Sequence, residues 1–248
     1  MSDVDLQGFF ETGFDLKMHL GNYLNLPLHE IDTLLPKAID DLAAIHPGSL
    51  APDQATLFYE EKVGTSHLFE LAAWHLNSSN YIGDTLRLLE SFAKGNVLDF
   101  GGGIGTHSIF SAALREVKHV YFVDLNPENR SFVQQRAEKL GLAKRISVHR
   151  DLESIGEIKF QTLVCFDVLE HIPDPASQLL TFETYLSANS VALMNWYFYK
   201  GDNGEYPFHF DDPAIVENFF ITLQSKFIEI FHPYLITARA YKLNNIIS

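Results

Sequence analysis

The chain has 248 residues, of which 46% are hydrophobic and 13% aromatic, and its formal net charge is −14. This composition is typical of a globular protein, either one large domain or a domain of about 150 residues with an accessory part, and it excludes a disordered chain. Nucleic acid is not expected as a partner, because binding a phosphate backbone needs a basic face.

Membrane contact is not expected either, because no apolar run reaches about 18 residues and the N-terminus MSDVDLQGFF lacks the basic start of a signal peptide. The single cysteine, Cys165, lies in the apolar run TLVCF and is expected to be a buried core residue. Since one cysteine forms no intrachain disulfide, we expect a cytoplasmic protein.

Only helical periodicity is found before residue 95. Apolar residues recur at three- and four-residue spacing in five segments: Leu6–Tyr23, Pro27–Ile45, Asp53–Val63, His67–Leu76 and Tyr81–Ala93. Pro36 is expected to divide the second segment. The predicted organisation is a helical extension over residues 1–80, followed by a larger domain over residues 81–248.

From residue 96 strands and helices alternate. The predicted strands are Val97–Phe100, Val120–Asp124, Ile146–His149, Thr162–Phe166 and Val191–Trp196. The helices between them are Thr106–Arg115, Pro127–Gly141 and Pro175–Leu186. This alternation predicts an α/β fold with a mostly parallel sheet covered on both faces.

The C-terminal part breaks the alternation. After a predicted helix at Pro213–Lys226, the strand-like runs Phe227–Phe231 and Leu235–Lys242 are separated only by HPY. So short a connection indicates an antiparallel hairpin at the sheet edge, which gives seven strands in all.

The first strand runs into DFGGGIGT, with Asp99 before Gly101, Gly103 and Gly105. A dinucleotide fingerprint needs a small third residue, but Thr106 or Ser108 stands there. An acid beside the glycines would repel a pyrophosphate and would favour a cationic ligand.

Acidic residues also follow the second and third strands. Asp124 stands roughly 20 residues after the last glycine, where a carboxylate accepts hydrogen bonds from ribose hydroxyls. Asn126 is the better cap for the helix that begins at Pro127, which leaves Asp124 for the sugar. Asp151 has two interpretations of equal weight: a partner for an adenine amino group, with Leu152 against the base, or a turn aspartate.

The fourth strand is followed by FDVLEHIPDP, which holds Asp167, Glu170 and His171 in one turn. Asp167 would hold an ammonium group or a substrate hydroxyl, and His171 would act as a base near neutral pH. For Glu170 and Asp174 the alternative is a solvated charge and a helix start.

The stretch after the fifth strand, residues 195–212, is aromatic-rich and has no helical period. It is predicted to be a lid or acceptor-pocket loop, with Asn195, Trp196, Tyr197 and His209 as candidates and ordinary packing as the alternative for each aromatic. The histidines of the chain are scattered without ligand-type spacing, so no metal site is expected.

Together, VLDFGGGIGTHS, VYFVDLNP, RDL and FDVLEHIPDP resemble the motifs of class I S-adenosylmethionine-dependent methyltransferases, with the last close to the quinone-biosynthesis and other small-molecule members. The resemblance covers about residues 85–242. At Gly102 the chain departs from the cysteine, threonine or serine usual in the family, which we expect only to loosen the turn.

The resemblance implies a Rossmann-like sheet, S-adenosylmethionine as cofactor, S-adenosylhomocysteine as product, and methyl transfer to oxygen or nitrogen of a small molecule or short peptide in biosynthesis. The implied cofactor-binding residues are Asp99, Gly101, Gly103, Gly105, Asp124, Leu125, Asp151, Leu152, Phe166 and Asp167. The candidate catalytic residues are His209, His171, Asp167 and Tyr197.

Residues 58–75 are the predicted roof over the cofactor, with Tyr59, His67 and Trp74 as candidates to reach the pocket and a core or helix-surface role as the favoured alternative for each. Two other functions stay open. One is a non-catalytic protein that binds the cofactor or its demethylated product. The other is a nicotinamide-dependent dehydrogenase, which the glycine spacing disfavours.

Overall fold

The computed structural model describes residues 4–45, 52–204, 206–233 and 236–244. Its centre is one seven-stranded sheet in the order β3-β2-β1-β4-β5-β7-β6. The strands are β1 (Gly95–Phe100), β2 (Val117–Val123), β3 (Ile146–His149), β4 (Phe160–Cys165), β5 (Leu186–Met194), β6 (Phe227–Phe231) and β7 (Arg239–Leu243). β1 to β5 pair in parallel, whereas β7 is antiparallel to both of its neighbours.

This arrangement confirms the predicted fold class, including the antiparallel pair at the C-terminal edge. The strand bounds differ by a few residues: β2 ends just before Asp124, and β5 begins at Leu186, five positions earlier than predicted. Two residues of the predicted hairpin, Tyr234 and Leu235, lie outside the described residues.

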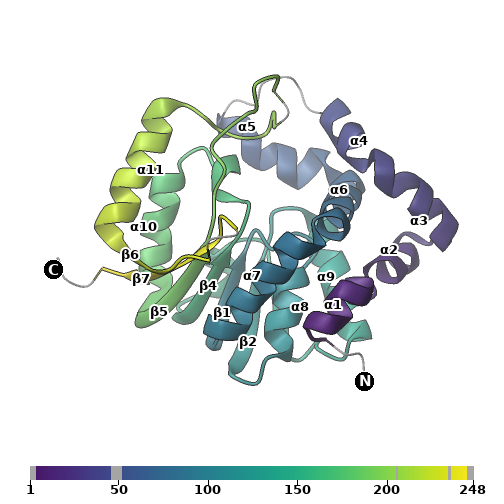
Figure 1. The fold of residues 1–248 in the computed structure, drawn as a ribbon, viewed down its shortest axis with the longest axis horizontal. Coiled ribbons are helices and arrows are strands. Elements are labelled where there is room, and N and C mark those ends of the chain that lie inside the picture. Colours follow the sequence, from purple (N-terminus) through teal and green to yellow (C-terminus); the bar gives the residue numbers. More distant parts are fainter. Residues whose placement is uncertain (1–3, 46–51, 205, 234–235, 245–248) are drawn as a thin grey trace.

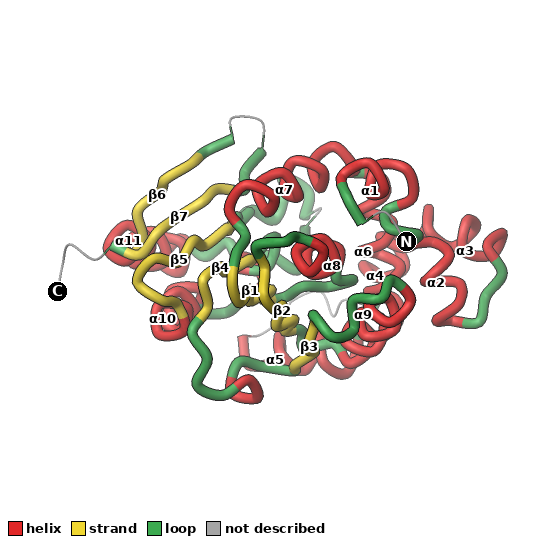
Figure 2. Tube along the Cα trace, turned by 90° about the horizontal axis from the view of Figure 1, so that it is seen from below, coloured by secondary structure: helices red, strands yellow, loops and turns green. Residues whose placement is uncertain are grey.

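Helices cover both faces of the sheet (Figure 2). One face packs against α7 (Ser79–Phe92), α8 (Thr106–Ala113) and α9 (Pro127–Lys139), and the other against α10 (Pro175–Tyr185) and α11 (Pro213–Lys226). Each face of the sheet has its own apolar cluster, because successive strand residues point to opposite faces. Val97 on β1 belongs to the first cluster, and its neighbour Leu98 belongs to the second. Cys165 is buried in the second, as expected.

The N-terminal part is helical, as predicted, but in shorter pieces. They are α1 (Leu6–Thr12), α2 (Leu16–Leu24), α3 (Leu28–Leu34), the 3₁₀ turn η1 (Leu35–Lys37), α4 (Ala38–Ala44), α5 (Pro52–Leu57), the π-helical turn η2 (Phe58–Lys62) and α6 (Gly64–Asn77). Pro36 lies in the 3₁₀ turn that separates α3 from α4, as expected.

The predicted helix Leu6–Tyr23 was wrong in its middle, where Gly13, Phe14 and Asp15 adopt positive φ. Gly13 ends α1 as its left-handed cap, and a long-range contact accompanies the break. The guanidinium of Arg136, on α9, donates to the carbonyl oxygens of Gly13 (3.0 Å) and Phe14 (3.2 Å). Sequence periodicity contains no trace of this contact.

The segment from η2 through α6 lies at the carboxyl ends of the central strands (Figure 1). Asn126, at the start of α9, donates to the carbonyl of Gly64 at 2.9 Å, and Arg150, after β3, forms a bidentate pair with Glu60 at 2.6 and 2.8 Å. Residues 58–75 therefore cover the edge of the sheet where the predicted site residues stand. The division at residue 80 stays a prediction.

Candidate functional site

The glycine turn after β1 bends sharply between the sheet and α8. Gly101 and Gly103 have φ of 70° and 55°, a region that side chains rarely adopt. A Cβ on Gly101 would lie 2.4 Å from Cγ2 of Val168, and one on Gly103 would lie 2.9 Å from Cδ1 of Leu71 in the roof. The turn thus contacts both the β4 loop and the roof.

Gly102 does more than loosen this turn, so that expectation was wrong. A Cβ at Gly102 would lie 2.5 Å from Cε2 of Phe122 and 2.9 Å from Oδ2 of Asp99. The ring of Phe122, fully buried on β2, occupies the space that a side chain at residue 102 would need. The glycine at position 102, where the family usually has a larger residue, therefore makes room for the Phe122 ring.

Asp99 and Asp124 both lie buried beside the turn. Asp99 accepts a hydrogen bond from Oγ of Ser108 at 2.6 Å, and burial raises its pKa to about 7. Asp124 accepts from the backbone N–H groups of Gly103 (2.9 Å) and Asn126 (2.8 Å), and burial raises its pKa to about 6. Asn126 caps α9 as predicted, but Asp124 is already held by the turn itself.

Asp151 has the contacts of a turn aspartate. Its carboxylate accepts from the N–H of Ser154 at 2.9 Å and pairs with Arg150 at 2.7 Å, and these hydrogen bonds lower its pKa. Leu152 is buried in the second apolar cluster. The adenine role of both residues stays a prediction.

Leu125 and Phe166 take different places near the strand ends. Leu125 is half-buried, and its carbonyl accepts a hydrogen bond from Arg130 at 2.7 Å. Phe166 is buried with its ring 5.0 Å from that of His107, centroid to centroid. Their predicted contact with the cofactor is untested.

Asp167 is fixed by residues from two distant elements. It has φ of 55°, and its N–H donates to Oδ1 of Asn195 at 2.6 Å. Nδ2 of Asn195 donates back to the Asp167 carboxylate at 2.6 Å and to the hydroxyl of Tyr81 at 2.5 Å. Burial raises the Asp167 pKa to about 6. A backbone held in this strained region is typical of a functional site.

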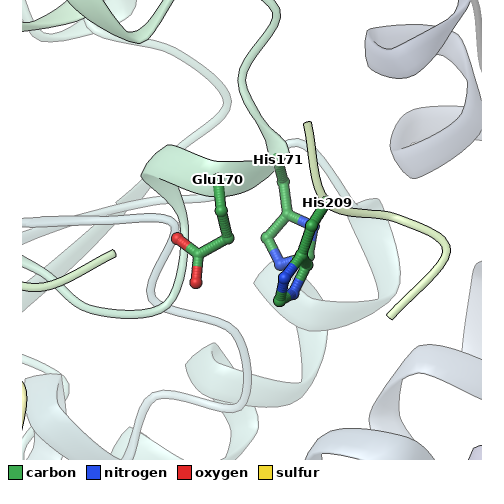
Figure 3. Close-up of side chains that lie close together, drawn as sticks. All are labelled: Glu170, His171 and His209. Carbon is green, nitrogen blue, oxygen red and sulfur yellow. The ribbon is translucent and has the colours of Figure 1, made fainter. Parts of the chain in front are cut away.

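The side chains of Glu170, His171 and His209 come together (Figure 3). One ligand-type atom from each lies within 4.8 Å of the others, and the two imidazole rings meet at 81° with centroids 4.8 Å apart. Glu170 is only 1% exposed, so its interpretation as a solvated charge was wrong. Asp174, in contrast, caps α10 through a hydrogen bond from Ser177, as expected.

Both candidate bases are weak in this environment. Burial lowers the pKa of His171 to about 3, with the neighbouring His209 adding to the shift, and burial also lowers the pKa of His209. Neutral imidazoles of such low pKa accept protons poorly near pH 7. Tyr197 is 44% exposed, with its ring edge-on to that of His209 at 5.9 Å.

The roof supplies further polar groups, only some of which were predicted. Tyr59 bonds through its hydroxyl to Nδ1 of His171 at 3.0 Å, and His67 lies 3.3 Å from Nδ2 of Asn129. Trp74 instead packs against Tyr81, with ring centroids 5.8 Å apart. Sequence reasoning missed Tyr81 and Glu70 as site residues, because helical spacing alone does not distinguish them from surface positions.

Carboxyl groups dominate the site: Asp99, Asp124 and Glu170 are buried, and Asp167 and Glu70 are half-buried. Burial raises the pKa of each, and none of the five forms an ion pair with another described residue. Uncompensated acids of this kind fit a ligand with positive charge. S-adenosylmethionine, with its sulfonium and ammonium groups, meets that requirement.

Known proteins resemble this chain in sequence and in fold. The model of a family described as "Methyltransferase domain" matches residues 73–201. Ubiquinone biosynthesis O-methyltransferases of two Xylella fastidiosa strains are 34% identical over 89 residues, which is 35% of this chain and 35% of each relative. The match thus spans about a third of those relatives.

Among solved structures, a protein described as an rRNA methylase from Clostridium thermocellum superposes with a TM-score of 0.51 at 16% identity, over 66% of this chain and 95% of its own. At that identity the likeness shows the fold alone. In the described part of this chain, no helix has the length and apolar character needed to cross a membrane.

Proposed function

This chain belongs to the methyltransferase domain family and is an enzyme of the S-adenosylmethionine-dependent class; we propose that it methylates an oxygen or nitrogen atom of a small molecule or short peptide in biosynthetic metabolism. The observation that carries the proposal is the set of uncompensated carboxyl groups at the ends of β1, β2 and β4.

Each of these acids has a proposed role. Asp99 would hold the ammonium group of the cofactor, Asp124 would accept the ribose hydroxyls, and Asp167 would lie near the sulfonium or the acceptor. Support comes from the burial of Asp99 and Asp124 and from the glycine turn beside them, in which the N–H of Gly103 donates to Asp124. When bound, S-adenosylmethionine supplies a methyl group on a positively charged sulfur.

The chain contributes mainly alignment and water exclusion. Alignment of two reactants supplies roughly 7–11 kcal/mol of a barrier. Asn195 and Tyr81 orient the carboxylate of Asp167, and the roof covers the turn through Leu71. Burial lowers the pKa of both His171 and His209, so each would be a weak base for a proton that leaves the acceptor.

A small acceptor is favoured by the aromatic surface beside the histidines. Tyr197, Tyr199 and Tyr206 are all exposed, and the ring of Tyr206 stacks on His209 at 5.2 Å. An aromatic surface of this kind suits a flat organic molecule. The ubiquinone biosynthesis relatives and the net charge of −14 support the same class over a nucleic acid.

The test is a screen of metabolite extracts with methyl-labelled S-adenosylmethionine, read by mass spectrometry. We expect one labelled small molecule that appears with the wild-type chain and not with heat-denatured protein. Tight binding of the cofactor without transfer to any extract would favour the non-catalytic alternative. Label found only in RNA would contradict the proposed acceptor class.

A further inference from the structure

Three side chains from two separate segments converge in the histidine cluster. Glu170 and His171 belong to the 3₁₀ turn η4 (Leu169–His171) after β4, whereas His209 comes from the irregular segment before α11. Their ligand-type atoms lie within 4.8 Å of one another, and Figure 3 shows the carboxylate beside the two rings.

The hydrogen bonds of the two histidines show which nitrogen of each ring can bind a ligand. Nδ1 of His171 lies 3.2 Å from the carbonyl oxygen of Phe208, and Nδ1 of His209 lies 3.0 Å from that of Tyr199. A carbonyl only accepts, so Nδ1 of His209 carries the proton and its Nε2 has a lone pair, whereas Nδ1 of His171 also lies 3.0 Å from the hydroxyl of Tyr59, which can donate as well as accept. Metal-binding histidines are held in the same way, by a second N–H bonded to a carbonyl.

Glu170 supplies an independent sign of a missing partner. Its side chain is buried, and its Oε2 has no hydrogen-bond partner among the residues that the structure describes. A buried carboxylate oxygen without a donor costs free energy unless a cation or a proton compensates it. Each neutral imidazole of the cluster has one nitrogen lone pair, which a cation can share.

We propose that Glu170, His171 and His209 form a binding site for one first-row divalent transition-metal ion, such as Mn²⁺, Co²⁺ or Zn²⁺. Two imidazole nitrogens and one carboxylate oxygen suit these ions better than Mg²⁺ or Ca²⁺, which prefer oxygen ligands. Metal–ligand bonds of about 2.0–2.2 Å place two ligands of one ion at most about 4.3 Å apart, so the 4.8 Å spread closes by small side-chain shifts.

The site departs from the sequence-based expectation of no metal. Residues 171 and 209 are 38 positions apart, so no ligand-type spacing exists in the chain, and only the fold brings them together. Three protein ligands leave further coordination positions open. The ion would stand in the loop that carries Asp167, next to the proposed methyl-transfer site.

Metal binding is measured directly, without cofactor or acceptor, so its failure is distinct from a failure of the proposed function. The full chain is stripped with a chelator and titrated with Co²⁺, followed by visible absorption and by metal analysis after gel filtration. Glu170→Gln and His209→Ala each remove one ligand. His119→Ala, at a half-buried histidine on β2, is the matched control.

We expect one Co²⁺ per wild-type chain, unchanged binding in His119→Ala, and affinity lowered more than about tenfold in each ligand variant. Mg²⁺ should not displace Co²⁺ at equal concentration. Absence of stoichiometric binding in the wild-type chain would overturn the proposal, and so would unchanged binding in folded His209→Ala. Since His209 is only half-buried, that variant keeps the test valid if Glu170→Gln does not fold.

Discussion

The carboxyl ends of the strands form two contrasting halves. On the glycine-turn side, at the ends of β1 and β2, Asp99 and Asp124 are tied to nearby backbone and side chains. On the histidine side, at the ends of β4 and β5, Glu170 has an oxygen without a partner among the described residues, and three tyrosines of residues 195–212 are exposed. The carboxylates of the first half are therefore fixed by the protein itself, whereas the second half keeps polar and aromatic groups with less protein contact.

The rigidity of the glycine-turn side depends on a buried guanidinium. Arg136 is 0% exposed and donates to the carbonyls of Ile104 (2.9 Å), Gly13 and Phe14. Arg136→Met should therefore lower the free energy of unfolding by about 4–6 kcal/mol, because three carbonyls lose a charged donor. Urea unfolding measures it, with the exposed Arg115→Met as control. A loss under about 1 kcal/mol would show that this contact does not stabilise the turn.

A pH titration of unfolding tests the buried acid Asp99 on the glycine-turn side next. Burial raises the pKa of Asp99 from 3.8 to about 7, so the folded state holds this proton more tightly than the unfolded state does. The stability it contributes is complete below pH 3.8 and is lost as pH rises toward 7. Asp99→Asn should flatten the pH dependence of unfolding over that range by about 4 kcal/mol.

The matched control for this titration is Asp41→Asn, which makes the same side-chain change at an exposed position. Parallel curves for Asp99→Asn and the wild-type chain would mean that Asp99 is not the buried acid described above.

Gly101 joins the two halves, since its missing side chain makes room for Val168. Gly101→Ala should destabilise the fold by about 2–4 kcal/mol, from left-handed strain and overpacking together. Gly141→Ala is a matched control, because its φ of 72° is similar but nothing lies within 4 Å of the added Cβ. It should cost only about 1–2 kcal/mol. Equal losses of stability in Gly101→Ala and Gly141→Ala, measured by thermal unfolding, would show that the contact with Val168 contributes nothing.

On the histidine side, His209→Ala should reduce turnover by about tenfold, equivalent to 1.4 kcal/mol, and leave cofactor affinity near that of the wild-type chain. The reason is that His209 packs with His171 and Tyr206, beside the proposed acceptor surface, so its loss should affect transfer more than cofactor binding. Transfer rates and calorimetry on the same samples give both values, with the exposed His232→Ala as control. An equal loss of both would make His209 a structural residue.

The two halves also differ in how far the sequence predicted them. The glycine-turn side lies in contiguous motifs, where DFGGGIGT and Asp124 follow consecutive strands, so strand order alone placed them together. The histidine side draws on α7, β4, β5 and residues 195–212, and its hydrogen bonds join residues up to 114 positions apart. Pattern and spacing do not encode such contacts, which is why the burial of Glu170 and the role of Tyr81 were missed.

The most direct test of the account is calorimetric titration of S-adenosylmethionine into the wild-type chain and into Asp124→Ala, with NAD as a comparison ligand. We expect micromolar or tighter binding of S-adenosylmethionine, no binding of NAD, and a loss of about 1.5–3 kcal/mol in the variant through missing charge-assisted hydrogen bonds. Binding of NAD alone, or unchanged affinity for S-adenosylmethionine in a folded Asp124→Ala protein, would contradict the proposed cofactor site.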